Sequence, residues 1–465
     1  MNKRILYICA AVLVLSLGKA QAQTGVSLSL EQCRSMSVEN DADIKNAALD
    51  VSSARALKQE ALTEYFPNVS VNAFGFYAFN PLLKVGLKDV LGNSDGAQNI
   101  IDAVEAAAPL YGIGTSASFL DYGYNASVSI TQPVYAGGRI VKGNRLARLN
   151  LQASLLKQAS ASKSKGVEVD EKYWKVVSLE EKLLSLEQAL KTVDTLSRDV
   201  KSACAAGLAL DTDTLKVSIE RGRLLSSRRQ LLSGIRLAKM DLFNAIGQNY
   251  SYFSQTSTES APWIDAIELT DRPSDQLPPD NYYVDQMKAA SASEESQLLS
   301  LNVESSRIQK KMALGEALPQ VGVGVGYGYG RVIGDHGRWN GAVYAVVKIP
   351  LTDYWKASCK MTRMENDALK AENQRDYLNS QLILQVHKLW EELTCAYEKI
   401  AIAEDEVKLS EIAEARTLNR YRSGQATITD VLSCQTESRL ANDSLTEAKI
   451  DYAIALSAYL SKTQQ

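Results

Sequence analysis

Residues 321–330 read Val-Gly-Val-Gly-Val-Gly-Tyr-Gly-Tyr-Gly, a strict alternation of apolar residues with glycine. A period of two predicts a strand, although glycine packs nothing and weakens a strand in an ordinary soluble sheet. Glycines on the crowded inner face of a narrow barrel, with valine and tyrosine facing lipid, would explain the pattern. The alternative is a glycine-rich soluble strand packed against helices.

The regions around this stretch predict three further strands. One is expected at about 340–351, and the strand that contains the alternation covers about 319–331. The other two are expected at about 67–79 and 122–136, separated by an insertion at about 80–120 that is rich in Gly, Ala and Asp. Aromatic residues near the strand ends are typical of a membrane interface. They are Tyr122, Tyr124, Tyr135, Trp339, Tyr344, Tyr354 and Trp355.

Long proline-free helices flank the strands. One is predicted from Gly138 to Gly207, followed by a returning helix over about 211–246. Its apolar residues keep the 3-4 spacing of a coiled-coil seam at Leu179, Leu183, Leu186, Leu190, Val193 and Val200. A second seam consists of Leu382, Val386, Leu389, Leu393, Ala396, Ile400 and Ala403.

The helix and strand pattern occurs twice. Gly207 follows Pro133 at the same spacing at which Gly424 follows Pro350. The internal duplication predicts a first helix-strand-strand-helix repeat over 23–247, an inter-repeat segment over 248–280 and a second repeat over 281–465. Within the repeats, helices are expected over 28–64, with Ser29 as N-cap, and over about 283–314.

Residues 1–22 have the pattern of a secretory signal peptide. A basic end is followed by an apolar run and by the cleavage site Ala20-Gln21-Ala22, and the run is too short to span a bilayer. The mature chain is therefore expected to be exported, with an uncleaved anchor as the alternative.

Composition excludes several functional classes. The formal net charge of −3 argues against a broad nucleic-acid surface. The cysteines beyond the signal segment form no Cys-x-x-Cys pair, and most are expected to pack as small apolar residues in helices; they are Cys33, Cys204, Cys359, Cys395 and Cys434. His336 and His387 lie far apart, and Asp335-His336 is expected to be a solvated loop pair. Because the sequence has no nucleophile-base pattern, phosphate loop or HExxH, we predict no enzyme, cofactor or metal.

With this duplicated order, the mature chain resembles the TolC-like outer membrane efflux proteins (outer membrane factors). The resemblance rests on Gln132-Pro133-Val134-Tyr135-Ala136-Gly137-Gly138-Arg139 and on the paired turns at 207–213 and 424–432. It implies a mixed α and β membrane protein, a homotrimer in which four strands per chain form a twelve-stranded outer-membrane β-barrel. This barrel would continue into a long α-helical coiled-coil barrel in the periplasm.

The resemblance also implies a function. The trimer would be a passive channel for substrates that an inner-membrane efflux pump delivers through a periplasmic adaptor protein. Two other classes stay open: an exported coiled-coil structural or adhesive protein without a pore, and a periplasmic adaptor. Neither explains both the glycine-alternating strands and the duplicated strand pairs.

The two helix turns are the candidate functional residues. Gly207 and Gly424 can adopt the left-handed conformation that ends a helix, and Asp211 and Thr427 are expected to cap the returning helices. Asp430, three residues after Thr427, is placed to complete a capping box.

The resemblance adds a second role at these turns. Asp430 matches the first of two acidic positions at a closed periplasmic constriction, whereas the second position is Ser433 and the latch arginine is replaced by Ala426. Asp213, preceded by Thr212, matches an acidic partner on the first turn. The implied constriction comprises Asp430, Ser433, Asp213 and Thr212, and the implied adaptor-docking tips comprise Gly207, Asp211, Gly424 and Thr427. Cap and gate remain alternative and compatible roles for Asp430.

Overall fold

The structure is a computed structural model and describes residues 27–79, 83–92, 94–108, 116–119, 122–207, 209–248, 264, 267–273, 276–331 and 336–463. The predicted signal segment 1–22 lies outside these residues, as does most of 248–280. The chain forms two compact units. The first takes its residues from 1–52, 152–301 and 373–465, and the second from 53–151 and 302–372. Each unit therefore contains parts of both sequence repeats.

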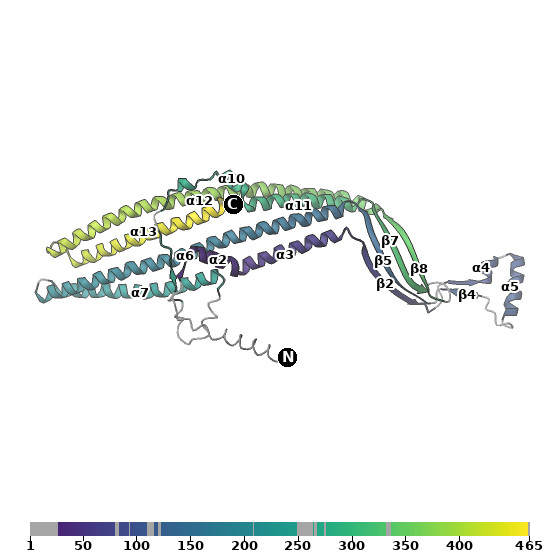
Figure 1. Cartoon of the computed structure of the whole chain (residues 1–465), viewed down its shortest axis with the longest axis horizontal. Helices are drawn as coiled ribbons and strands as arrows, with labels where there is room; N and C mark the ends of the chain where they lie inside the picture. Colours follow the sequence, from purple (N-terminus) through teal and green to yellow (C-terminus); the bar gives the residue numbers. More distant parts are fainter. Residues whose placement is uncertain are drawn as a thin grey trace, which may run out of the picture. The chain divides into compact units, whose positions relative to one another are not determined.

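The main elements follow the same order in both repeats (Figure 1). The first repeat contains α2 (Leu30–Asn40), α3 (Ala42–Thr63), β2 (Asn68–Tyr77), β5 (Tyr122–Ala136), α6 (Arg139–Ala205) and α7 (Asp211–Ala245). The second contains α10 (Gln286–Ala292), α11 (Glu294–Glu316), β7 (Gln320–Arg331), β8 (Arg338–Lys348), α12 (Leu351–Arg422) and α13 (Ile428–Thr463). None of the described helices combines the length and the apolar composition needed to cross a bilayer.

The insertion adds a small substructure to the second unit. The strands β3 (Leu83–Gly86) and β4 (Ser116–Phe119) pair antiparallel. Between them in the sequence lie α4 (Leu87–Leu91) and α5 (Asp95–Ala107). The insertion predicted at about 80–120 therefore contains helices as well as a strand pair, and the strand pair has no sequence signal that we recognised.

Two helices that the sequence predicts as continuous are each broken at one residue. Asp41 separates α2 from α3, and Ser293 separates α10 from α11; both have extended backbone. Asp41 Oδ1 accepts hydrogen bonds from the N–H groups of Asp43 (2.8 Å) and Ile44 (3.3 Å). Ser293 Oγ likewise accepts one from the N–H of Ser296 (3.2 Å). The prediction of unbroken helices is wrong here because each side chain caps a new helix.

Other local predictions agree with the structure. Ser29 caps α2, and its side chain and that of Gln32 satisfy each other's backbone N–H groups. The strand expected at 340–351 instead ends at Lys348, since Pro350 has no N–H for a ladder and Leu351 begins α12.

Coiled-coil seams form cores of the first unit. The α6 residues Leu186, Leu190, Val193 and Val200 are buried together with Val217 and Leu224 of α7 and Ile428 and Val431 of α13. The α12 seam is buried against α13 in a second cluster. Its α12 members are Val386, Leu393, Ala396, Ile400 and Ala403. The predicted seams are therefore confirmed at these positions.

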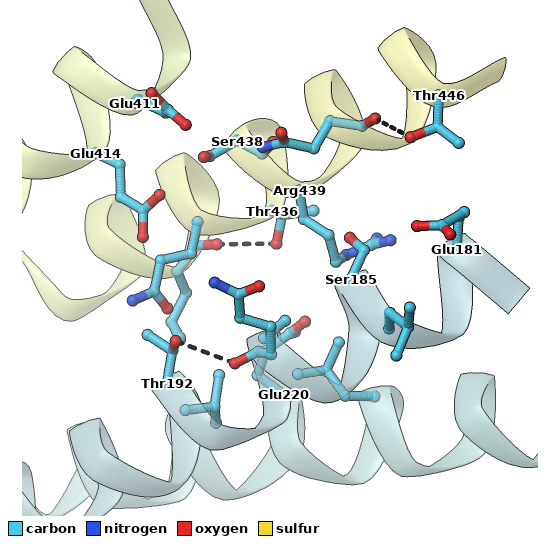
Figure 2. Close-up of a pocket in the computed structure, with 18 of the residues that line it drawn as sticks. Glu181, Ser185, Thr192, Glu220, Glu411, Glu414, Thr436, Ser438, Arg439 and Thr446 are labelled. Carbon is cyan, nitrogen blue, oxygen red and sulfur yellow. Dashed lines mark hydrogen bonds between the residues drawn. The ribbon is translucent and has the colours of Figure 1, made fainter. Parts of the chain in front are cut away.

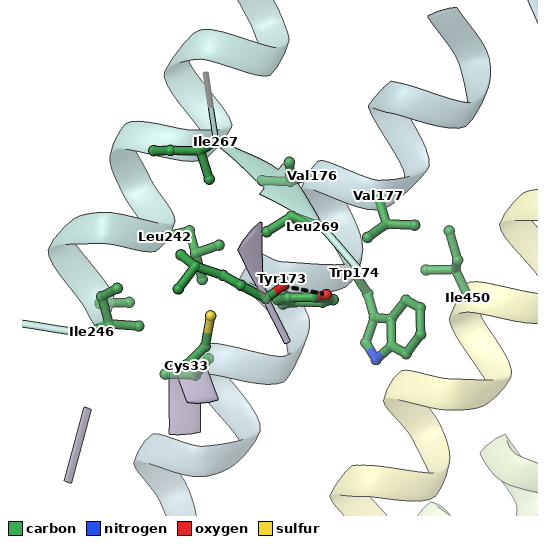
Figure 3. Close-up of a cluster of buried hydrophobic side chains, with 13 residues drawn as sticks. Cys33, Tyr173, Trp174, Val176, Val177, Leu242, Ile246, Ile267, Leu269 and Ile450 are labelled. Atoms are coloured by element: carbon green, nitrogen blue, oxygen red, sulfur yellow. Dashed lines mark hydrogen bonds between the residues drawn. The ribbon is translucent and has the colours of Figure 1, made fainter. Parts of the chain in front are cut away.

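A third core surrounds Tyr173 of α6 (Figure 3). The Tyr173 hydroxyl donates to the carbonyl of Leu28 (3.2 Å) and lies 3.1 Å from Asp271 Oδ2, which also accepts from the N–H of Leu30 (2.6 Å). β1 (Ser27–Leu28) pairs in parallel with β6 (Glu268–Leu269). Residues 27–30 and 268–271 are thus fixed to the same helix.

The expectation that most cysteines are small packing residues in helices is confirmed only in part. Cys33 is buried in the core around Tyr173, but Cys359 and Cys395 are exposed, and Cys204 and Cys434 are half-buried. All five are free thiols. The helical spacing of an isolated cysteine does not reveal which face it occupies.

Candidate functional site

The four-stranded sheet of the second unit has one apolar face. Its strand order is β2-β5-β7-β8, and all neighbouring strands are antiparallel. The register places one row of side chains across all four strands: Val69, Ile130, Val325 and Val343. These side chains are 62, 43, 48 and 82% exposed, respectively. An exposed apolar surface that continues across a whole sheet is typical of contact with lipid or another protein.

The opposite face of the same sheet carries most of its polar side chains, with Phe74 and Val346 lying among them, and is called the polar face below. The neighbouring row consists of Ser70, Ser129, Gly326 and Ala342. The hydroxyl oxygens of Ser70 and Ser129 are 2.8 Å apart, and the Asn72 amide donates to Ser129 at 3.2 Å. The β7 glycines lie on this face, so the prediction that they face away from Val and Tyr is confirmed.

An aromatic cluster marks one end of the apolar face. Tyr124 and Tyr329 have ring centroids 6.1 Å apart, and the Tyr327 and Trp339 rings stack at 5.4 Å. This arrangement resembles the aromatic belts at membrane interfaces. The prediction that Tyr344 belongs to such a belt is wrong, since it pairs with Gly324 on the polar face. The side chains of Tyr354 and Trp355 lie outside the described set.

Both edges of the sheet are open within one chain. β2 and β8 are the edge strands and pair only with β5 and β7, respectively, among the described strands. Their outer backbone N–H and C=O groups can therefore pair with the strands of another copy of the chain. Strands exposed to lipid require such pairing, because lipid offers their backbone no hydrogen-bond partner.

The first helix turn joins α6 to α7 in the first unit. Gly207 has φ +71°, the left-handed conformation that the sequence predicts. The N-cap of α7 is Leu210, without a side-chain capping bond, so the prediction for Asp211 is wrong by one residue. Because Leu210 has extended backbone, helical geometry begins at Asp211, and Asp211 and Asp213 instead place negative charge in the first turn.

The second turn, between α12 and α13, is built more tightly. Gly424 has φ +75°, and the N–H of Gln425 donates to the carbonyl of Arg420 at 2.7 Å, as in a Schellman motif. Asp430 Oδ2 accepts from the N–H and the hydroxyl of Thr427, both at 2.8 Å. Thr427 Oγ1 in turn accepts from the N–H of Asp430 at 3.2 Å. The predicted capping box is confirmed.

Positive groups lie near the acids of the two turns. Hydrogen bonds from Thr427, followed by the charges of Arg420 and Lys216, hold the pKa of Asp430 below its usual value. Lys216 Nζ lies 3.7 Å from Asp213 Oδ1. Burial and then the charge of Asp213 raise the pKa of Tyr421. Charged groups of each turn therefore act on titratable groups of the other turn.

The hydrophobic cluster that contains the α6 seam joins the same two turns. Ile428 and Val431 of α13 are fully buried with Val200 of α6 and Val217 of α7. Ser433 is exposed and donates to Glu437 at 3.3 Å. Burial therefore fixes one face of the α13 start, while Thr427, Asp430 and Ser433 remain exposed to solvent.

A polar cavity of about 410 Å³ lies between the two helical hairpins of this unit (Figure 2). Glu181 and Glu220 line it from the first hairpin, and Glu411 and Glu414 line it from α12. Arg439, also in its wall, pairs with Asp443 at 2.7 Å. No group of three or more acidic, histidine or cysteine side chains among the described residues is arranged to hold a metal. The cavity is a polar seam between the two hairpins.

Sequence reasoning missed Lys216 and Arg420 as neighbours of Asp430. Lys216 could have been found three residues after Asp213 on the same helix. Arg420, in the last turn of α12, is near enough for its charge to act on Asp430 because the chain reverses at Gly424.

These features define the fold of the TolC-like outer-membrane efflux channels. Similar solved structures are the outer membrane protein VceC of Vibrio cholerae (15% identity, TM-score 0.71, covering 93% of this chain and 95% of that one) and the Campylobacter jejuni CmeC outer membrane channel (11%, 0.72, 93% and 85%). CusC, described as forming a transmembrane channel, is also similar (13%, 0.73, 96% and 95%). Neither a protein-family model nor a curated protein matches the sequence. At these identities the similarity establishes the fold.

Proposed function

We propose that three copies of this chain form an outer-membrane channel that is the exit duct of a tripartite efflux system. The observation that carries the proposal is the sheet with an apolar face, a polar face and two open edges. A lipid-exposed edge strand leaves backbone groups unsatisfied, so the sheet must close. Three copies would supply twelve strands, an even number typical of outer-membrane barrels.

In this proposal the apolar face contacts lipid and the polar face lines the duct. The helical hairpins extend into the periplasm, and 248–280 belongs to an equatorial segment around them. The similar structures of CmeC and CusC are described as channels, so we assign no catalytic role.

The paired turns form the periplasmic end of the duct. Asp430, Ser433, Asp213 and Thr212 line the constriction, where the carboxylates favour cations. The tips shaped by Gly207, Asp211, Gly424 and Thr427 dock on a periplasmic adaptor, which connects the channel to an inner-membrane pump.

The test is planar-bilayer conductance of the detergent-purified mature chain after its oligomeric mass has been measured. We expect a trimer that gives discrete current steps. A soluble species that never enters the bilayer would overturn the proposal and favour the pore-free coiled-coil protein or the adaptor. For the constriction, Asp430→Asn should lower cation selectivity; unchanged selectivity in a conducting trimer removes that role.

A further inference from the structure

The charges on the four-stranded sheet all have the same sign. β2, β5, β7 and β8 contain Arg331, Arg338 and Lys348 but no Asp or Glu in their described residues. The chain as a whole is slightly acidic, with a formal net charge of −3. The absence of carboxylates from these strands is therefore a local property.

The register separates these three cations between the two faces. Arg338 pairs with Gly330 and Lys348 pairs with Gln320, so both lie on the polar face, at its opposite ends. Arg331 pairs with Tyr124 on the apolar face, and its guanidinium lies 3.5 Å from the Tyr122 ring centroid. The polar face thus has a cation at each end.

Between these cations the polar face carries uncharged hydrogen-bonding groups, together with the apolar side chains of Phe74 and Val346. Ser70, Asn72 and Ser129 form a hydroxyl and amide cluster. The hydroxyls of Tyr344 and Thr131 are 3.3 Å apart. Hydroxyl and amide groups can donate to an anion, while the strands supply no carboxylate to repel it.

We propose that the polar face of the sheet is an anion-selective lining, which takes solutes with carboxylate, sulfonate or phosphate groups. The proposal rests on the proposed function, because it requires this face to enclose the duct. Three copies would then place one ring of Arg338 and one of Lys348 around the lumen. Cations on low-dielectric walls concentrate counter-ions between them. The positive charge of this lining would be opposite to the negative charge of the acidic helix turns.

The experiment measures the electrostatic potential at the lining directly. Ala342→Cys places a thiol on the polar face, between Arg338 and Lys348 along β8. Ala342 is exposed and lies opposite Gly326, where even an added β-carbon would have open space around it. The full-length trimer in proteoliposomes is treated with an anionic or a cationic methanethiosulfonate, and modification of the segment around residue 342 is followed by mass spectrometry. Each rate is divided by that of free cysteine. A shifted thiol pKa affects both reagents equally and cancels in the ratio.

We expect the normalised anionic-to-cationic rate ratio to be about threefold or more, because counter-ions accumulate at the charged lining. Arg338→Gln should reduce it and Arg338→Glu should bring it below one. Arg331→Gln is the matched control, since this arginine lies one rung away on the opposite face; it should leave the ratio unchanged. A ratio of one or less, or no response to Arg338→Gln, overturns the proposal. Ser129→Cys, in the same row, repeats the test if Ala342→Cys does not assemble.

Failure of the proposed function gives a different result. Val343→Cys lies on the apolar face, where its native side chain is 82% exposed. Lipid should protect it from both charged reagents. If it reacts as fast as Ala342→Cys with either reagent, the sheet is not embedded in lipid and the channel proposal fails, whatever the ratio at residue 342.

Discussion

The ring of Tyr344 lies across Gly324 on the neighbouring strand and reaches Thr131 on the strand beyond. A β-carbon on Gly324 would lie 2.4 Å from Tyr344 Cζ, a distance that no real side chain tolerates. The hydroxyls of Tyr344 and Thr131 are 3.3 Å apart. The glycine therefore allows an aromatic side chain to lie flat against the polar face.

Gly324→Ala should destabilise the sheet or move the Tyr344 ring outward from its surface. Overpacking of this kind costs about 1–3 kcal/mol, so the temperature at which the folded protein denatures should fall. Gly326→Ala is the control, because a β-carbon there would have open space around it. Equal denaturation temperatures for the two variants would contradict the close packing of Tyr344 on Gly324.

The capping box at the second turn should be lost in acid. Because the folded-state pKa of Asp430 is lowered, its contribution to stability is present above the ordinary carboxyl pKa and disappears as pH falls through the lower folded value. Hydrogen exchange of residues 427–431, corrected for intrinsic rates, should therefore increase below about pH 4. Asp430→Ala should show the faster exchange already at pH 6. Equal protection of wild type at pH 6 and pH 3 would contradict this role.

Thr427→Ala removes the other half of the capping box. Loss of a threonine N-cap costs about 0.5–2 kcal/mol, which we expect as local fraying at the start of α13. Hydrogen exchange of the same segment measures it. Thr446→Ala is a matched control within α13, because its hydroxyl donates to the carbonyl of Asn442 one turn earlier. If both variants increase exchange at residues 427–431 equally, the Thr427 cap does not stabilise the start of α13.

The negative charge of the buried Asp170 carboxylate should depend on the guanidinium of Arg34 for its stabilisation. Arg34 Nε and Nη2 donate to the two carboxylate oxygens at 2.7 and 2.5 Å, and Asp170 is 1% exposed. Arg34→Gln leaves the buried carboxylate without its positive partner, although the Ser457 hydroxyl still donates to it, and should cost about 3 kcal/mol. Asp170→Asn in the same chain should recover part of this loss, and denaturant unfolding measures both.

An exposed ion pair provides the comparison for Arg34. Arg221 and Asp194 lie 2.7 Å apart, but both side chains are about half exposed. Arg221→Gln should therefore cost less than about 1 kcal/mol. A loss as large as that of Arg34→Gln would show that burial does not determine the difference.

Cys33 should resist alkylation in the folded protein. Burial, together with the negative charge of Asp271, raises the pKa of its thiol to about 11. At pH 8 almost no thiolate of Cys33 is present and the side chain is buried, whereas Cys395 is exposed to the reagent. Iodoacetamide labelling followed by mass spectrometry should modify Cys395 first and Cys33 only after unfolding. Comparable rates for both thiols in the folded protein would contradict the burial of Cys33.

Much of the local structure could be predicted from the sequence. The strand over 122–136, the helix that begins after Gly138 and the glycines that end α6 and α12 follow from periodicity and from backbone conformations that only glycine adopts easily. The breaks at Asp41 and Ser293 also had a local signal, an N-cap residue within a helical pattern, which apolar periodicity alone obscured.

The sequence by itself determined the elements, because alternation, seams and turn residues act between near neighbours in the chain. Only the tertiary structure decided which side chains meet across strands and hairpins. Register placed Arg331 and Arg338 on opposite faces of the sheet and moved Tyr344 from the predicted belt to the polar face. Chain reversal brought Arg420 to Asp430. Such encounters depend on pairing and packing between distant segments, which no local pattern specifies.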